Sequence, residues 1–192
     1  MPTQPVTRFT VEQYLAKERA AEFRTEYVNG EIFATAGGAR NHALIAAAVI
    51  SRLDEQLRDR PCAVAGSDLR LFCQKAQMLT YPDAVVFWEP GRFLDGDRDT
   101  LVDATLIVEV LSRSTQNYDR GEKFRSYRGL PSFSEYLLLA QDAVRAEHHV
   151  RQPDGTWLFR ELNEPETFID LKSIGCRLQL GSVYRKVQPE TA

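Results

Sequence analysis

A short apolar run with one charged residue inside it limits the possible folds of this chain. Residues 106 to 111 read Leu-Ile-Val-Glu-Val-Leu, so Glu109 interrupts an otherwise apolar segment. Such a run predicts a β-strand in the protein interior. Side chains alternate between the two faces of a strand, and the neighbours of Glu109 on its own face, Ile107 and Leu111, are apolar. The carboxylate is therefore expected where an unpaired charge costs several kcal/mol.

Several arrangements would explain Glu109. Its carboxylate could pair with an arginine or lysine, or become protonated, or bind a metal ion. It could also point to solvent from a strand that is half exposed. The residues around it, taken alone, leave these possibilities open.

Helical patterns and short strands alternate along the chain, and they predict one α/β domain over residues 1–192. Thr10, with Gln13 three residues later, predicts a capped helix over residues 10–23, and Asn29-Gly30 predicts a tight hairpin. Apolar residues at helical spacing predict a long helix over residues 41–60. The remaining expectations are strands within 62–73, 81–88, 106–111, 135–140, 145–152 and 156–162, a surface loop over 89–103, a helix over 117–129 and a strand-rich segment over 168–187.

Composition excludes several classes of protein. The net charge of -3 argues against a general nucleic-acid-binding surface, although a few local cations could still grip phosphates. The three cysteines are far apart in sequence, which predicts neither a zinc site nor a disulfide framework but reduced thiols, as in a cytoplasmic protein. The N-terminus lacks the pattern of a signal peptide, and no apolar stretch is long enough to span a bilayer.

Asp83 is a second carboxylate at the start of an apolar strand. It follows Pro82, so turn chemistry alone could account for it. If its strand lies beside that of Glu109, the two carboxylates could converge at one edge of the sheet. Two hard oxygen ligands suit Mg²⁺ or Mn²⁺ better than zinc. A divalent ion held by such a pair is a recurring device for phosphodiester hydrolysis.

The helix after the second strand carries a cation. Asp119, Lys123 and Tyr127 are four residues apart and share one helix face. Asp119 and Lys123 could form an ordinary surface ion pair, worth about 0.2–0.5 kcal/mol. Lys123 could instead lean toward the two carboxylates, where it would orient or deprotonate a water or stabilise charge on a phosphate.

These segments together resemble a known family. The order and spacing are similar to those of the Uma-two type family of restriction endonucleases, in the PD-(D/E)XK nuclease superfamily. The resemblance covers about Thr10 to Trp157. The matching segments are Tyr-Pro-Asp-Ala-Val-Val at 81–86, Ile-Val-Glu-Val-Leu-Ser at 107–112, Ser114-Thr115, Asp119 with Lys123 and Tyr127, the strand after Ser134, and, upstream, residues 26–32 and His42.

The resemblance implies a restriction-endonuclease-like fold, a mixed central β-sheet flanked by helices. It also implies cleavage of DNA that depends on Mg²⁺, with Mn²⁺ as a substitute, and Asp83 and Glu109 as the metal ligands. The superfamily lysine would stand two residues after the acid, where this chain has Leu111. Lys123 on the following helix is the expected replacement.

Two further residues are candidates. Glu26 is a possible third carboxylate, since the superfamily often has an acidic residue near the N-terminal helix; otherwise it is a solvated hairpin charge. His42 could donate to a phosphate or cap the long helix.

Two other functions stay open. The fold could serve as a non-catalytic nucleic-acid-binding or protein-interaction module, or Asp83 and Glu109 could act as an acid and base without metal. For a nuclease that cuts both DNA strands, a homodimer is expected.

Overall fold

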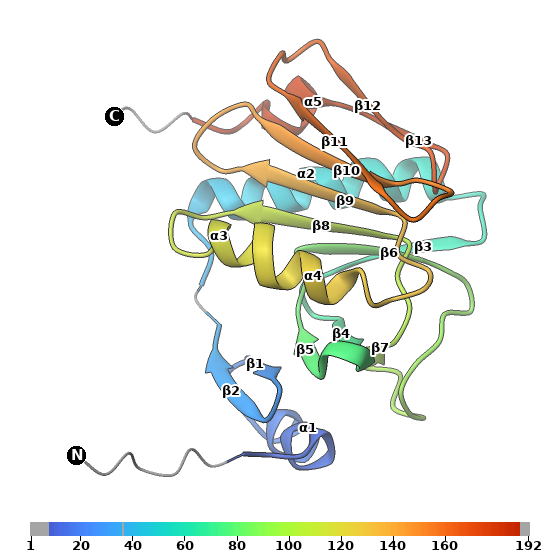
Figure 1. The fold of residues 1–192 in the computed structure, drawn as a ribbon. Helices are drawn as coiled ribbons and strands as arrows, with labels where there is room; N and C mark the ends of the chain where they lie inside the picture. The colour runs from blue at the N-terminus through green and yellow to red at the C-terminus, as the bar shows by residue number, and fades with distance from the viewer. Residues whose placement is uncertain (1–7, 36, 189–192) are drawn as a thin grey trace.

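The computed structural model describes residues 8–35 and 37–188. Its centre is a six-stranded mixed sheet in the order β11-β10-β9-β8-β6-β3 (Figure 1). β8 runs parallel to β9 and antiparallel to β6. The strands of this sheet are β3 (Cys62–Gly66), β6 (Ala84–Trp88), β8 (Leu106–Leu111), β9 (Glu135–Ala140), β10 (Ala146–Arg151) and β11 (Trp157–Leu162).

A second sheet of five strands, in the order β2-β1-β5-β4-β7, lies against one end of the first. Its outer face packs on the first helix through Tyr14, Leu15, Tyr27, Phe72 and Leu79. The elements of this part are α1 (Val11–Arg19), β1 (Thr25–Val28), β2 (Glu31–Ala34), β4 (Arg70–Cys73), the short helix η1 (Gln74–Ala76), β5 (Met78–Thr80) and β7 (Thr100–Leu101).

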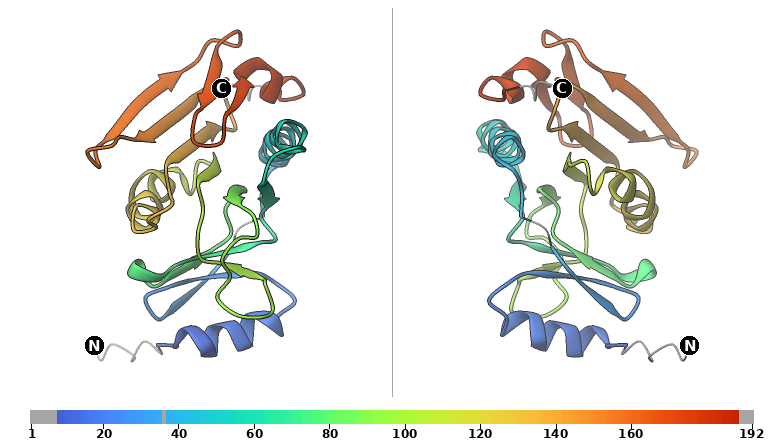
Figure 2. Two further views of the ribbon diagram at one scale, coloured as in Figure 1. Left: turned by 90° about the vertical axis from the view of Figure 1, so that its right-hand side faces the viewer. Right: turned by 90° about the vertical axis from the view of Figure 1, so that its left-hand side faces the viewer.

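Helices cover both faces of the central sheet, as the two side views in Figure 2 show. One face carries α2 (Arg40–Leu57), α5 (Leu180–Tyr184) and the hairpin of β12 (Phe168–Leu171) and β13 (Cys176–Gln179). The opposite face carries a continuous helical stretch formed by α3 (Gln116–Tyr118), the π-helical turn η2 (Asp119–Lys123) and α4 (Phe124–Tyr127). The central strands are therefore buried on both sides.

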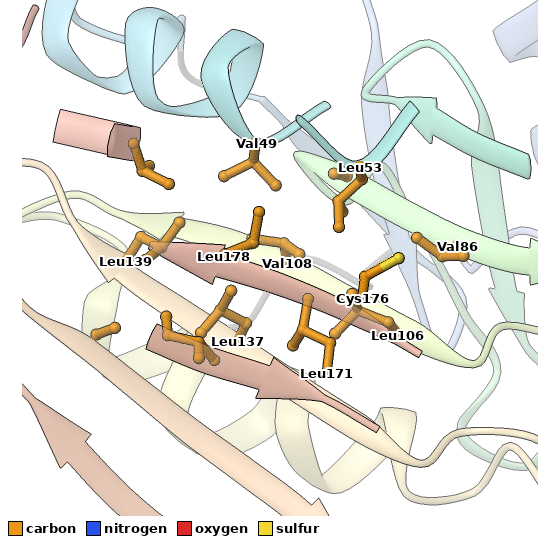
Figure 3. Close-up of a cluster of buried hydrophobic side chains, with 14 of the residues drawn as sticks. Val49, Leu53, Val86, Leu106, Val108, Leu137, Leu139, Leu171, Cys176 and Leu178 are labelled. Atoms are coloured by element: carbon orange, nitrogen blue, oxygen red, sulfur yellow. The ribbon is translucent and has the colours of Figure 1, made fainter. Parts of the chain in front are cut away.

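The core under α2 follows from residue spacing. Ile45, Val49, Leu53 and Leu57 recur every four residues and are buried, so they form one apolar stripe. Figure 3 shows that Val49 and Leu53 point toward side chains from alternate positions of the strands. The labelled partners are Val86, Leu106, Val108, Leu137, Leu139, Leu171, Cys176 and Leu178. Because alternate residues of β8 enter this core, Glu109 must face the other side of the sheet.

Local signals predicted the N-terminal elements. Thr10 and Gln13 form the expected capping box of α1, although the helix ends at Arg19 instead of continuing to residue 23. Asn29 and Gly30 have φ of 47° and 95°, which are the positive values that a tight two-residue hairpin between β1 and β2 requires.

One expectation was wrong, and another was incomplete. Residues 89–103 are not entirely a surface loop, because Thr100 and Leu101 are buried and form β7, parallel to β4. The C-terminal segment contains the helix α5 in addition to its two strands.

Cys62, Cys73 and Cys176 are all free and buried. In the described ranges, no helix combines the length and the apolar character needed to cross a membrane.

Candidate active site

The pairing of β6 with β8 brings the first two predicted carboxylates together. Ala84 lies opposite Val108, so the same register places Asp83, one residue earlier, opposite Glu109. The Oδ2 atom of Asp83 accepts a hydrogen bond of 2.7 Å from the backbone N–H of Val110. The Asp83 side chain is thus fixed against the strand that carries Glu109.

Glu109 lies inside the protein, with only 4% of its surface exposed. Its Oε1 atom accepts a hydrogen bond of 2.6 Å from the Tyr127 hydroxyl and lies 3.1 Å from Nζ of Lys123. The alternative in which Glu109 points to solvent is therefore wrong. The alternative in which its carboxylate pairs with a lysine is the one that the structure shows. Both donors come from the helical stretch that covers this face of the sheet.

Lys123 lies at the centre of the charged groups. Its Nζ atom also lies 3.4 Å from Asp119 and 3.5 Å from Glu26. Lys123 and Asp119 are both buried, so the alternative of an exposed surface pair is wrong. Both residues belong to the π-helical turn η2, a widened turn that often occurs at functional sites. The Tyr136 hydroxyl donates a hydrogen bond of 3.1 Å to the Asp119 carbonyl oxygen, which ties this turn to β9.

Glu26 reaches the cluster from the second sheet. The β1–β5 register places it opposite Thr80, whose hydroxyl donates a hydrogen bond to Glu26 Oε1. Its side chain is only 15% exposed, so it is not a solvated hairpin charge.

His42 approaches Asp83 from the start of α2. Its Nε2 atom lies 3.2 Å from Asp83 Oδ2. The N-cap of α2 is Ala39, so His42 does not cap this helix.

Negative groups outnumber positive ones in this cluster. Four carboxyl groups, from Glu26, Asp83, Glu109 and Asp119, surround one ammonium and one imidazole. Burial raises the pKa of Glu109 to about 8; Lys123 opposes this rise, and the charges of Asp119 and Asp83 add to it. Burial likewise raises the pKa of Asp119, against the effect of Lys123.

Burial acts on the pKa of the two cationic groups in the opposite direction, but their net pKa values are raised as well. Burial lowers the pKa of Lys123, but attraction to Glu109, Glu26 and Asp119 outweighs it, and the net pKa lies above that of an ordinary lysine. The hydrogen bond to Asp83 raises the pKa of His42 in spite of partial burial. Lys123 is consequently a permanent cation at neutral pH.

The side chains of the cluster could supply only part of the coordination shell of a divalent ion. Across residues 8–35 and 37–188, no group of three His, Cys, Asp or Glu side chains has the arrangement of a complete metal site. Mg²⁺ is commonly held by one or two carboxylates, with water and substrate phosphates completing its shell. Asp83 and Glu109, adjacent across two strands in a cluster with excess negative charge, match that requirement.

The structure thus brings together all five predicted residues, Asp83, Glu109, Lys123, Glu26 and His42. The sequence did not predict that the Tyr127 hydroxyl contacts Glu109 or that Thr80 contacts Glu26. The four-residue spacing of Lys123 and Tyr127 was the available signal for the first contact. The second depends on a strand pairing that no local pattern indicates.

Comparison with known proteins identifies the family and a solved structure with the same fold. Residues 11–181 match the model of the Uma2 family, described as "Putative restriction endonuclease". Two proteins of Synechocystis sp., sll1609 and slr1290, both named uncharacterized, are 35% and 33% identical. The first match covers 80% of this chain and 86% of the relative, and the second covers 96% and 95%.

A solved structure shares the fold. It is described as the crystal structure of "a putative nuclease belonging to DUF820" from Anabaena variabilis. The TM-score is 0.74 at 16% identity, and the match covers 94% of this chain and 99% of the other. The predicted fold class, a restriction-endonuclease-like mixed sheet flanked by helices, is confirmed.

Proposed function

The chain belongs to the Uma2 family, and from this premise we propose that it is a metal-dependent endonuclease that hydrolyses DNA phosphodiester bonds. Asp83 and Glu109 would hold Mg²⁺, or Mn²⁺ in its place, and Lys123 would assist the reaction. The observation that carries the proposal is the convergence of these three residues from separate segments. Asp83 is hydrogen-bonded to the residue after Glu109, and Lys123 lies 3.1 Å from Glu109.

The metal would supply two effects when bound, polarisation of a phosphate oxygen and a lowered pKa for an attacking water. The chain's own groups divide the remaining work. Lys123, whose pKa the neighbouring carboxyl groups raise, would stabilise negative charge that develops on the phosphate and would not serve as a base. His42 donates toward Asp83 and orients that carboxylate. Glu109, whose pKa burial raises, would have to be ionised to hold the metal.

Nicking of supercoiled plasmid DNA tests this proposal. The full chain is expected to nick plasmid in Mg²⁺ and to stop in EDTA. Glu109→Gln and Asp83→Asn are expected to be inactive, because each removes one metal-binding carboxylate. Glu122→Gln is the matched control, since it removes a carboxylate from the exposed side of the same helical stretch. Absence of nicking by the parent chain, or equal nicking by Glu109→Gln, contradicts the proposal.

The same assay separates the other possible functions. Nicking that persists in EDTA would favour acid–base hydrolysis without metal. DNA binding without nicking under any divalent ion would favour a non-catalytic module. The convergence of Asp83, Glu109 and Lys123 argues against the second of these, because a binding module has no need of a buried acid–acid–lysine cluster.

A double-strand cut takes two active sites, so the proposal includes a homodimer acting on DNA in the cytoplasm. Sedimentation velocity of the chain with and without duplex DNA measures this. A monomer in both samples would restrict the activity to nicking of one strand at a time.

A further inference from the structure

A basic site, separate from the acid-rich cluster, lies at the far end of the helical stretch that carries Lys123. It is a surface pocket of about 330 Å³, here called the arginine pocket. No carboxylate lines it, although the whole chain has a net charge of -3. The lining residues are Arg125, Arg128, Gly129, Arg151, Gly155 and Trp157.

The three arginines differ in how far they are neutralised. Arg125 pairs with Glu122 at 3.0 Å, an exposed pair of little strength. Arg128 lies over the Phe124 ring, 5.2 Å from its centre, and Arg151 donates a hydrogen bond of 3.2 Å to the Pro131 carbonyl. Within the described part of the chain, neither Arg128 nor Arg151 forms a salt bridge with a carboxylate. The positive charges of these two guanidinium groups are therefore not compensated by a neighbouring carboxylate.

Neighbouring groups strengthen the basic character of the pocket. Lys75 lies beside it, because a Cβ built on Gly129 would be 3.4 Å from the Lys75 Cβ. Trp157 is half-buried and packs on Phe124 with ring centres 5.1 Å apart, so its indole forms an apolar wall. A cationic pocket with an aromatic wall matches a phosphate group together with the sugar attached to it.

The arrangement has a partial structural explanation. Arginines near the C-terminus of a helix interact favourably with its dipole, which accounts for Arg125 and Arg128. It does not account for Arg151, which comes from β10 and is exposed. Two unrelated segments thus bring guanidinium groups to one pocket.

We propose that the arginine pocket binds a backbone phosphate of the DNA, away from the phosphate that is cleaved. This inference rests on the proposed function and adds a contact that holds the substrate. Arg128 follows Lys123 by five residues, which is about 7.5 Å along a helix axis. The helical stretch turns Lys123 inward to the carboxylates and Arg128 outward to the pocket. One element would then position both the chemistry and the substrate.

Binding of a DNA duplex in EDTA tests the pocket without requiring cleavage. Fluorescence anisotropy would compare the full chain with Arg151→Gln and with Arg128→Gln/Arg151→Gln. Each phosphate contact contributes a slope of about 0.9 in the logarithmic dependence of affinity on salt. Because the pocket holds one phosphate, the parent should lose about 3.5-fold more affinity than the double variant between about 50 and about 200 mM salt. Arg177→Gln, a matched charge removal beside Asp170 on the C-terminal hairpin, should behave like the parent.

The outcomes separate this inference from the proposed function. A salt slope that is unchanged in both variants overturns the pocket proposal and does not affect the nicking test. If the parent chain fails to nick DNA but Arg151→Gln still lowers the salt slope, only the proposed reaction is overturned. Arg151→Gln should unfold at the same urea concentration as the parent, which excludes a folding defect. If the variants lose binding of inorganic phosphate, measured by calorimetry, but keep DNA affinity, the pocket serves a free phosphorylated ligand and the proposal is wrong.

Discussion

Replacing Glu109 by glutamine should make the protein more stable, and increasingly so as the pH rises. The buried carboxyl group has a pKa of about 8, against 4.5 for an ordinary glutamate. Below pH 4.5 the group is protonated in both the folded and unfolded chain. Between the two pKa values only the unfolded chain ionises, so the parent loses stability as the pH rises until about 8. Glutamine has nearly the same shape as glutamate but does not ionise, so the variant does not lose stability in this way.

The size of the effect follows from the two pKa values. The interval from 4.5 to about 8, at about 1.36 kcal/mol per pH unit, sets a ceiling of about 5 kcal/mol on the gain relative to the parent. The amide oxygen can still accept the hydrogen bond from Tyr127. Lys123 keeps Asp119 and Glu26 as partners in the variant.

Urea unfolding followed by circular dichroism, in EDTA at pH 5, 7 and 9, measures this gain. The stability difference between Glu109→Gln and the parent should grow by several kcal/mol over this range. Glu122→Gln, on an exposed side chain, controls for the loss of one negative charge. A difference that stays constant from pH 5 to pH 9 would refute the reasoning, because it would mean that Glu109 is already ionised in the folded protein.

Three further substitutions probe the neighbours of Glu109 and Asp83. Lys123→Met should lower the nicking rate in Mg²⁺ by about 100-fold or more, since it removes the cation at the reaction centre, with gel assays of plasmid as the readout. His42→Ala should weaken Mn²⁺ binding by about 10- to 100-fold, measured by calorimetry, because Asp83 loses the group that orients it. Tyr127→Phe should lower the free energy of unfolding at pH 7 by about 1–2 kcal/mol in urea titrations, because Glu109 loses a buried hydrogen-bond donor.

The control for these variants removes an exposed cation that lies outside both the charged cluster and the arginine pocket. Arg177→Gln, on the C-terminal hairpin, should keep full nicking activity. Lys123→Arg keeps the positive charge in a side chain of different shape, so it separates the effect of charge from the effect of shape. Full activity in Lys123→Met, or an unchanged Mn²⁺ affinity in His42→Ala, would contradict the roles given to these residues.

Much of the candidate site was predictable because its residues carry local signals. Glu109 is conspicuous in an apolar strand, and Lys123 shares a helix face with Asp119 and Tyr127. The step that sequence could not supply was the register that places Asp83 opposite Glu109. Register depends on which strands become neighbours, and many pairings of short apolar strands have similar local patterns.

The elements that were missed are short or depend on distant partners. β7 has two residues, and its pairing with β4 joins segments about 30 residues apart. α5 has five residues, too few for a helical period to be distinguished from a strand. The π-helical turn at Asp119–Lys123 has no sequence signature, yet it contributes two of the charged groups in the cluster.

Glu109 is the residue on which the metal site depends, and a calorimetric Mn²⁺ titration at pH 7 tests it most directly. Titrations in two buffers with different heats of ionisation count the protons released on binding. The parent chain should bind Mn²⁺ and release close to one proton, because a carboxyl group with a pKa of about 8 must ionise to become a ligand. Glu109→Gln should bind much more weakly and release none from this position. Equal Mn²⁺ affinity for both proteins, with no proton released by the parent, would contradict a metal site at Glu109.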